Sequence, residues 1–337
     1  MIRVALDAMG GDDAPAALVD GAVLALAQLP ADLEITLVGR EDAVRAALAR
    51  HHGTDTSRLR IVHAPDAIGM AEKPLAAVRK KPKSSLVVGF KLHRDGEVDA
   101  MVSAGNTGAT LAAATVILGL HDGVDRATVA SPFPTADGIV LVLDAGANVD
   151  CSSRELVNFA RLGTIYMRDM VGRADPAVGL LNVGEEDEKG GAVVRETHRA
   201  LQQQPRIRYV GNIEGRDIVV PHPEHGRVDV VVCDGFVGNV VLKFYESIGP
   251  LVTRLLQRDR PDLLGSPELE PIRRFFDYSE YGGAPLLGVR GVAIICHGSD
   301  SPSAIKNALA RAMESVRTGL GAHIAAEMTS DEPAAAR

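Results

Sequence analysis

The sequence predicts an α/β protein with a doubly wound, mostly parallel sheet in three α/β/α layers. Apolar runs of strand length recur along the 337 residues without polar alternation, which is the pattern of strands that are covered on both faces. Stretches with the apolar spacing of an amphipathic helix follow several of these runs. Strand and helix therefore alternate along most of the chain, as they do in doubly wound folds.

The apolar runs and the helical stretches give the expected elements. Strands are expected at residues 2–8, 35–38, 86–88, 98–102, 139–143, 178–181, 207–210, 228–232 and 292–295. Helices are expected at residues 16–29, 110–118, 154–170, 191–203, 239–248 and 303–318. Most of the expected strands stop at a glycine or at a small polar cluster, so the turns that follow them are candidates for binding sites.

The pattern predicts one α/β/α domain over residues 1–320. Between Pro250 and Phe276 it changes to a charged, proline-broken stretch without a strand, which predicts a helical arm inserted at residues 249–276. Small and polar residues without a core pattern end the chain, so residues 321–337 are expected to form a disordered tail.

Charge and composition exclude several classes of function. The 36 Lys and Arg against 44 Asp and Glu leave a net charge of −8, which provides no general positive field for nucleic acid. Trp is absent, so stacking platforms for single strands are scarce. The three cysteines are far apart, which argues against a disulfide framework and fits a reducing cytoplasm. Residues 100–120 are uncharged, but their glycines and polar side chains favour a strand, a turn and a helix over a membrane span.

The clearest candidate site is the corner SAGNTGA at residues 103–109, between a strand and an uncharged helix. Its glycines allow close approach to the backbone, and its neutral polar side chains supply hydrogen-bond donors beside a helix N-terminus. The candidate binding residues here are Ser103, Gly105, Asn106, Thr107 and Gly108. Such a corner suits a small oxyanion such as phosphate, and a capped turn without a ligand is the alternative interpretation.

A second corner, DGFVGN, repeats these elements with Asp234, Gly238 and Asn239. The acidic corner NVGEEDEKG holds Lys189 among four carboxylates, which would fix its ammonium as a stabiliser of a developing oxyanion. A solvated charge run is the alternative interpretation. His297 follows an apolar strand and precedes Gly298, where it can exchange a proton or serve as a structural hydrogen-bonded group.

With these motifs in view, the chain closely resembles the bacterial phosphate acyltransferase family of phospholipid synthesis. The resemblance runs from Ile2 to about Thr318. The motifs that carry it are, in order, DAMGGD, EKPLAAVRKKPKSS, SAGNTGA, DAGANVDC, NVGEE, GNIEGRD, VVVCDGFVGNVVLK, DYSEYGGAPLLG and HGSDS. The resemblance implies a fold similar to the isocitrate and isopropylmalate dehydrogenase group, a homodimer, and no metal, nucleotide or other cofactor.

The resemblance also implies an activity. Enzymes of this family reversibly transfer a fatty acyl group from acyl carrier protein to inorganic phosphate. The acyl phosphate then serves a downstream glycerol-3-phosphate acyltransferase. A cytoplasmic location with peripheral contact at the inner face of the membrane is implied as well. The arm from Leu251 to Ile272 is poorer in apolar residues than the arms of members that dip a hydrophobic tip into the bilayer.

The expected mechanism needs position and charge stabilisation more than a general base, because phosphate is already an anion and a thiolate is a good leaving group. Phosphate is expected against the SAGNTGA corner, with Gly238 and Asn239 opposite and Arg216 as a bidentate clamp. Lys189 is expected to stabilise the tetrahedral oxyanion, and His297 or a water molecule to protonate the departing sulfur.

Acyl carrier protein is acidic, so its docking on a chain of net charge −8 requires a local basic patch. One candidate patch comprises Arg79, Lys80, Lys81 and Lys83. The other, the arm patch, comprises Arg254, Arg258, Arg260, Arg273 and Arg274. A plain solvated face is the alternative for each patch.

Three other functions are compatible with the sequence. The same fold admits a phosphotransacylase of the acetyl-phosphate type and a decarboxylating dehydrogenase that needs a nicotinamide and a divalent metal. A non-catalytic scaffold that binds a carrier protein at the membrane is the alternative outside enzymes. Such a scaffold would tolerate replacement of the polar residues at the strand ends but not of the basic arm.

Overall fold

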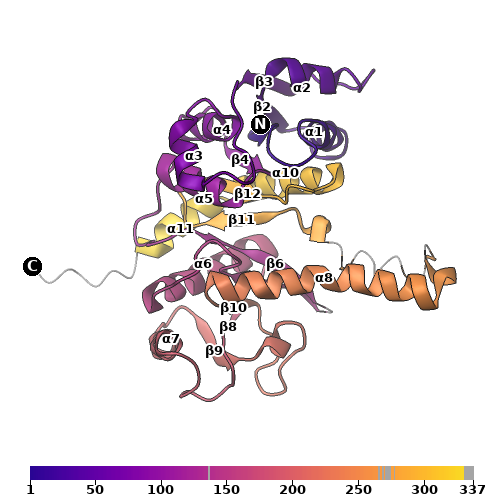
Figure 1. The fold of residues 1–337 in the computed structure, drawn as a ribbon. Coiled ribbons are helices and arrows are strands. Elements are labelled where there is room, and N and C mark those ends of the chain that lie inside the picture. Colours follow the sequence, from indigo (N-terminus) through magenta and orange to yellow (C-terminus); the bar gives the residue numbers. More distant parts are fainter. Residues whose placement is uncertain (136, 265, 268, 270–274, 277, 330–337) are drawn as a thin grey trace, which may run out of the picture. The chain divides into compact units, whose positions relative to one another are not determined.

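The computed structural model describes residues 1–135, 137–264, 266–267, 269, 275–276 and 278–329. The chain forms two compact units, each with a sheet (Figure 1). The first comprises Met1–Ala127, Asp169–Gly172 and the chain from Tyr281 onward, and the second comprises Thr128–Arg168 and Arg173–Glu280. The single sheet domain predicted over residues 1–320 is therefore divided. An even alternation of strands and helices gives no signal of where one sheet stops and the next begins.

The sheet of the first unit is mostly parallel. Its strands are β1 (Ile2–Asp7), β2 (Leu33–Gly39), β3 (Leu59–His63), β4 (Ala100–Ser103), β11 (Ala284–Leu287) and β12 (Val292–Ile295). Their order is β3-β2-β1-β4-β12-β11. The two-residue strand β5 (Thr128–Val129) belongs to the second unit. Only β11 among these six strands runs antiparallel, against β12.

Helices cover both faces of this sheet. They are α1 (Ala16–Gln28), α2 (Glu41–Leu48), α3 (Pro74–Lys80), α4 (Ser85–Arg94), α5 (Thr107–Ile117), α10 (Pro302–Arg317) and α11 (Leu320–Thr329). Val4, Leu6 and Val102 belong to the buried core that α1 and α10 cover. Met101, whose side chain alternates with theirs, meets α4 instead, where a Cβ on Gly89 would lie 2.5 Å from its methyl carbon. The predicted three-layer α/β/α arrangement is therefore confirmed.

The prediction of a strand at residues 86–88 is wrong. These residues belong to α4, which begins after Ser84, whose Oγ accepts the N–H of Val87 at 3.4 Å. Leu86, Val87 and Phe90 are all buried. A short, fully apolar run is equally compatible with a buried strand and a buried helix, so its periodicity alone does not decide between them.

The expectation of a disordered tail from residue 321 is also wrong as far as residue 329. Those residues lie in α11, where Leu320, Ile324 and Met328 are buried at a helical spacing of four. The three apolar residues stand among small residues, so they form a stripe too short to stand out in the sequence. The remainder of the expected tail lies outside the described residues.

The second unit has a five-stranded sheet in the order β6-β7-β10-β8-β9. Its strands are β6 (Ser131–Thr135), β7 (Gly138–Leu143), β8 (Ala177–Leu181), β9 (Arg208–Ile213) and β10 (Val230–Val232). All pair in parallel except β6, which is antiparallel to β7. The sequence did not predict β6, because Pro132 and Pro134 disfavour a strand; at the edge of a sheet, prolines are tolerated.

The helices of the second unit are α6 (Ser153–Val171), α7 (Ala192–Gln202) and α8 (Gly235–Asp259), with 3₁₀ turns at Gly215–Ile218, Pro261–Leu263 and Tyr278–Tyr281. The arm predicted from residue 249 does not begin there, because α8 continues through Pro250 as one helix of 25 residues (Figure 1). Only part of the expected arm beyond Asp259 is described. Among the helices that the structure describes, none combines the length and the apolar composition that crossing a bilayer requires.

The register of the parallel strands places the ends of neighbouring strands, where the candidate motifs begin, at the same level in each sheet. In the first unit, Val102 of β4 lies opposite Leu6 of β1 and Ile294 of β12. In the second unit, Val232 of β10 lies opposite Leu143 of β7 and Leu180 of β8. Because these neighbours are parallel, the loops that follow them leave from one edge of each sheet.

Replacement of Gly238 by Ala should strongly destabilise the second unit. A methyl group there would collide with the backbone carbonyl oxygen of Asp144, which has no flexible end that can move away. We expect a cost of about 1–3 kcal/mol or more, seen as a lower midpoint of thermal unfolding. Gly321→Ala is the matched helical control, because a Cβ at that position meets no atom within 4 Å. The close contact would be disproved by equal midpoints for the two variants.

Candidate active site

Three loops meet at one edge of the sheet in the first unit. They follow β1, β4 and β12 and carry the motifs DAMGGD, SAGNTGA and HGSDS. The N–H of Asp12 donates to the carbonyl oxygen of Gly298 at 2.7 Å, which joins the first loop to the third. A Cβ on Gly10 would lie 2.7 Å from the amide nitrogen of Gly105, so the first and second loops touch through their backbones. The resulting corner has no room for a side chain at Gly10.

The carboxylate of Asp7 organises this corner. It is buried at the end of β1 and accepts the hydroxyl of Ser103 at 2.9 Å and the N–H of Met9 at 3.1 Å. The Ser103 hydroxyl in turn accepts the N–H of Gly105 at 3.1 Å. Burial raises the pKa of Asp7, and the hydrogen bonds from Ser85 and Ser103 oppose that shift. Ser103 is fully buried, so its hydroxyl serves the turn.

Asn106 uses both ends of its amide within the protein. Its Oδ1 caps α5 by accepting the N–H of Ala109 at 3.0 Å. Its Nδ2 donates to the carbonyl oxygens of Met70 at 2.7 Å and Glu72 at 3.2 Å. Thr107, by contrast, is exposed at the first position of α5. The first turn of this helix has no acidic residue, so the helix dipole presents its positive end unopposed.

Gly108 and His297 also lie at this edge of the first unit. A Cβ on Gly108 would lie 2.6 Å from Cγ of Pro74, so α5 and α3 approach closely here. His297 is partly buried after β12, and its backbone N–H donates to Oδ2 of Asp300 at 2.9 Å. The structure therefore brings together Ser103, Gly105, Asn106, Thr107, Gly108 and His297.

The second unit has a corresponding buried carboxylate at the end of β7. Asp144 accepts the N–H of Val129 at 2.9 Å and the hydroxyl of Thr128 at 3.1 Å. It also accepts two hydrogen bonds from Asn148, from its backbone and from its side chain. The carbonyl of Asn148 then receives the N–H of Gly235 at 2.7 Å. Asp144 thereby connects the end of β7 to the start of α8, and its burial raises its pKa.

The start of α8 shows why the second corner is shaped as it is. Asp234 caps the helix, with Oδ1 accepting the N–H of Val237 at 2.9 Å. Gly238 is buried against Asp144, and Asn239 is exposed beside Gly146. The structure therefore assigns Asp234 and Gly238 a part in packing and capping, and it leaves the Asn239 side chain in reach of a ligand.

Lys189 is held less closely than the sequence predicts. Its ammonium lies 4.0 Å from the carboxylate of Glu186 and is about half exposed. Asp187 pairs with His198 at 3.1 Å instead, and Glu185 pairs with Arg216. Three of the four expected carboxylates therefore lie beside different side chains, Glu186 beside Lys189, Asp187 beside His198 and Glu185 beside Arg216. The backbone of Lys189 is fixed by Asn182, whose Nδ2 donates to its carbonyl oxygen at 3.2 Å.

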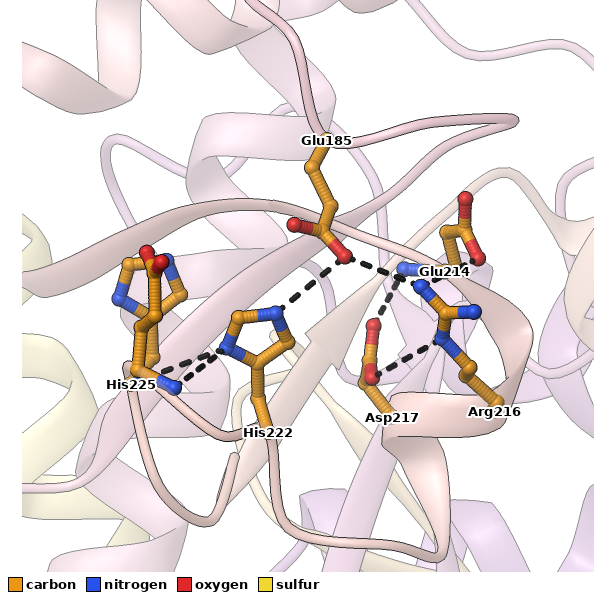
Figure 2. Close-up of polar contacts among 7 residues, drawn as sticks. Glu185, Glu214, Arg216, Asp217, His222 and His225 are labelled. Atoms are coloured by element: carbon orange, nitrogen blue, oxygen red, sulfur yellow. Dashed lines mark hydrogen bonds and ion pairs between the residues drawn. The ribbon is translucent and has the colours of Figure 1, made fainter.

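Arg216 lies in a cluster of charged side chains (Figure 2). Its guanidinium is 3.3 Å from Glu185, 3.1 Å from Glu214 and 3.9 Å from Asp217. A phosphate could use Arg216 as a clamp only by displacing carboxylates, because the group already has acidic partners. Sequence reasoning missed these pairs, since Glu185 and Arg216 are distant along the chain and no pattern relates them.

His222 completes the cluster in Figure 2. Its Nδ1 accepts the backbone N–H groups of Glu224 at 3.1 Å and His225 at 3.3 Å, so the ring proton is on Nε2. Nε2 lies 3.2 Å from Glu185 and donates to it. A nearly buried histidine thus orients Glu185 toward Arg216. Within the described residues, no group of three or more His, Cys, Asp or Glu side chains is arranged to hold a metal ion.

Comparisons with known proteins agree on one family. The family described as "Fatty acid synthesis protein" matches residues 2–323. The chain is 45% identical to "Phosphate acyltransferase" of Geobacter sp. (strain M21), over 100% of this chain and 95% of that protein. It is 46% identical to "Phosphate acyltransferase" of Heliobacterium modesticaldum (strain ATCC 51547 / Ice1), over 94% of each chain.

Solved structures show the same fold at low identity. EutD phosphotransacetylase from Staphylococcus aureus aligns with a TM-score of 0.63 at 17% identity and 94% coverage of each chain. A phosphotransacetylase from Streptococcus pyogenes aligns with a TM-score of 0.61 at 19% identity, again over 94% of each chain. These likenesses support the predicted fold class.

Replacement of Asp144 by Asn should change how stability depends on pH. Burial raises the pKa of Asp144 above its ordinary value of 3.8, so the folded protein holds this proton more tightly than the unfolded chain does. Its contribution to the unfolding free energy is therefore largest at acidic pH and falls as the pH rises. Asp144→Asn removes that titration. It also places an amide against the donors of Asn148, at a cost of about 1–3 kcal/mol.

The stability gap between the natural protein and Asp144→Asn should therefore be widest in acid and narrow toward neutral pH. Urea unfolding of both proteins across that range measures it. A gap that stays constant with pH would show that Asp144 titrates as it does in the unfolded chain.

Proposed function

We propose, from the premise that this chain belongs to the phosphate acyltransferase family, that it transfers a fatty acyl group from acyl carrier protein to inorganic phosphate. Membership makes the protein an acyltransferase of fatty acid and phospholipid synthesis. The proposal adds the carrier-bound donor and the roles of individual residues. The observation that supports it most is the glycine-lined corner at the N-terminus of α5 in the first unit.

Phosphate is proposed to bind at this N-terminus. The N–H groups of Thr107 and Gly108 belong to the first turn, and the exposed Thr107 hydroxyl adds a third donor. Ser103 and Asn106 support the site indirectly, because their side chains hold the turn through Asp7 and Met70. The proposed contacts are therefore made by neutral groups on a rigid loop.

The reaction needs little activation of its nucleophile. A phosphate oxygen attacks the thioester carbonyl carbon, and the tetrahedral intermediate carries its negative charge on the former carbonyl oxygen. The carbon–sulfur bond then breaks, which gives acyl phosphate and a thiolate whose pKa is about 8.5. Lys189 is proposed to stabilise the oxyanion. His297 or a water molecule is proposed to supply the proton to the sulfur.

Lys189→Ala should lower kcat by about 10² to 10³, the usual loss when one oxyanion donor is removed. The assay follows acyl phosphate and free carrier thiol formed from long-chain acyl carrier protein and phosphate. Lys243→Ala is the control, because that lysine pairs with Glu246 on α8 at 2.8 Å. Near-normal turnover by Lys189→Ala would rule out the proposed role.

The same assay separates the alternative functions. A phosphotransacylase of the acetyl type would prefer a short-chain coenzyme A thioester to the long-chain carrier thioester. A metal-dependent dehydrogenase would form no acyl phosphate and would lose its activity in EDTA. A non-catalytic scaffold would bind the carrier protein without releasing thiol.

The first candidate patch, called the α3 patch because Arg79 and Lys80 end helix α3, is the better supported docking site for acyl carrier protein. Arg79, Lys80 and Lys83 are exposed at and after the last turn of α3. Lys81 already has an acidic partner, since its ammonium donates to the carboxylate of Glu72 at 2.6 Å and lowers the pKa of that carboxyl. The backbone carbonyl oxygen of Glu72 also accepts a hydrogen bond from Nδ2 of Asn106. The patch therefore belongs to the segment that supports the proposed phosphate site.

The arm patch has less free charge. Arg258 pairs with Asp259 at 2.7 Å, and Arg260 pairs with Asp262 at 2.6 Å. Arg254 is exposed on α8. Arg273 and Arg274 lie outside the described residues. Adjacent carboxylates therefore offset much of the positive field that an acidic partner would meet along the described arm.

Charge reversal of the α3 patch should weaken carrier docking. Arg79→Glu combined with Lys80→Glu is expected to raise KM for acyl carrier protein about tenfold at low salt and to flatten its dependence on salt. Arg254→Glu combined with Arg258→Glu is the matched reversal on the arm and should change KM little. The opposite pattern would move the docking site to the arm, and no change in either variant would refute both patches.

A homodimer is also part of the proposal. Exposed apolar residues recur on α8 at helical spacing, and a stripe of this kind marks a surface that another protein covers. The stripe consists of Phe236, Val240, Phe244, Leu251 and Leu255. We propose that a second copy of the chain covers it. The cytoplasmic location and the peripheral membrane contact that the resemblance implies also belong to this proposal.

A further inference from the structure

The second unit contains an apolar pocket that the proposed mechanism does not use. It has a volume of about 550 Å³, within the range of small-molecule sites. The loops after β7, β8 and β10 and the first turns of α7 and α8 form it. Apolar side chains dominate its lining, among them Leu156, Leu180, Leu181, Val194 and Val237.

Exposed valines gather at this pocket from three separate segments. Val149 is 63% exposed, Val183 is 80% exposed and Val193 is 39% exposed, and all three line it. Isolated apolar residues on a surface need no explanation, but their convergence on one hollow marks a place where an apolar ligand is covered.

The pocket also lacks a cation that would favour an anionic ligand inside it. Its thiols are neutral, because burial, aided by the negative charge of Asp144, raises the pKa of Cys151 to about 12 and burial raises that of Cys233 further above its ordinary range. Of its two carboxylates, Asp234 is engaged as the cap of α8. The lining as a whole suits a hydrocarbon and not a phosphate or a sugar.

One end of the pocket adjoins the loop that carries Lys189. Asn182 and Gly190 line it, and Asn182 donates to the carbonyl oxygen of Lys189 at 3.2 Å. A ligand with a reactive polar head and an apolar tail can therefore place its tail in the pocket while its head stays at the loop of the proposed oxyanion donor.

We propose that this pocket binds the alkyl chain of the acyl donor, with the thioester end toward the Lys189 loop. The inference rests on the proposed function and adds a location for the chain, which was not expected from the sequence. Each methylene that enters an apolar site improves binding about three- to fourfold. The kcat/KM for saturated donors should therefore rise steeply with chain length until the pocket is filled.

Gly191→Phe tests the location. Gly191 lines the pocket at the start of α7, and a Cβ there meets no atom within 4 Å, so a larger side chain enters open space. The variant should keep its activity on the shortest acyl donors and lose most of the rise with chain length. Gly321→Phe on α11 is the matched control, because it has equally open surroundings and should keep the natural slope.

A second pair of variants, at Val193, tests the pocket independently in case Gly191→Phe fails to fold. Val193→Asp puts a carboxylate on the pocket wall at a partly exposed helix position and should also flatten the chain-length slope. Val193→Leu keeps the wall apolar and should preserve a positive slope. Calorimetric titration with a long-chain fatty acid in the absence of phosphate should show binding with a negative heat-capacity change, weakened at least tenfold by Gly191→Phe.

Two outcomes would overturn the proposal. A Gly191→Phe enzyme with the natural slope would show that the chain lies elsewhere. An equal loss for every chain length would show that the pocket receives a part common to all donors, such as the pantetheine arm. Failure of the proposed function would look different, since the natural protein would then form no acyl phosphate from any donor.

Discussion

A buried carboxylate at the end of a central strand supports each unit of this protein. Asp7 and Asp144 follow β1 and β7, and both accept hydrogen bonds from the loop of a neighbouring segment. A buried carboxylate is costly unless such donors surround it, so the loops must stay where the donors are satisfied. Close backbone packing accompanies both residues, because Gly10 lies against the Asp7 carboxylate and Gly238 lies against the backbone of Asp144. Buried hydrogen bonds therefore anchor the loops at the ends of β1 and β7.

Much of the fold could be predicted because buried parallel strands leave continuous apolar runs, as β7, β10 and β12 do. The errors came from segments in which that signal is ambiguous or masked. The buried run at Leu86 is a helix, the edge strand β6 contains two prolines, and the apolar stripe of α11 stands among small residues. The division into two sheets depends on long-range pairing, which no local pattern records.

The candidate site was only partly predictable, because helix caps and anion sites use the same residue types. Asn106 and Asp234 stood out as binding residues, and the structure shows both as caps of helices. The role of Arg216 as a phosphate clamp was also predicted without knowledge of its neighbours. Its partners Glu185 and Glu214 come from different loops, and the sequence alone does not show that their charges offset it. The apolar pocket went unnoticed because its valines look like core residues in a sequence.

The uncharged first turn of α5 has a consequence for how the enzyme would respond to its surroundings. Under the proposed function, the carrier protein meets exposed cations on α3, whereas phosphate meets short-range dipoles on a fixed loop. Dissolved ions screen the attraction between separated charges far more than they screen hydrogen bonds at contact distance. A change in ionic strength would therefore alter the supply of acyl groups while leaving the capture of phosphate almost constant. Carrier delivery would then be the step through which osmotic conditions set the rate of acyl phosphate formation.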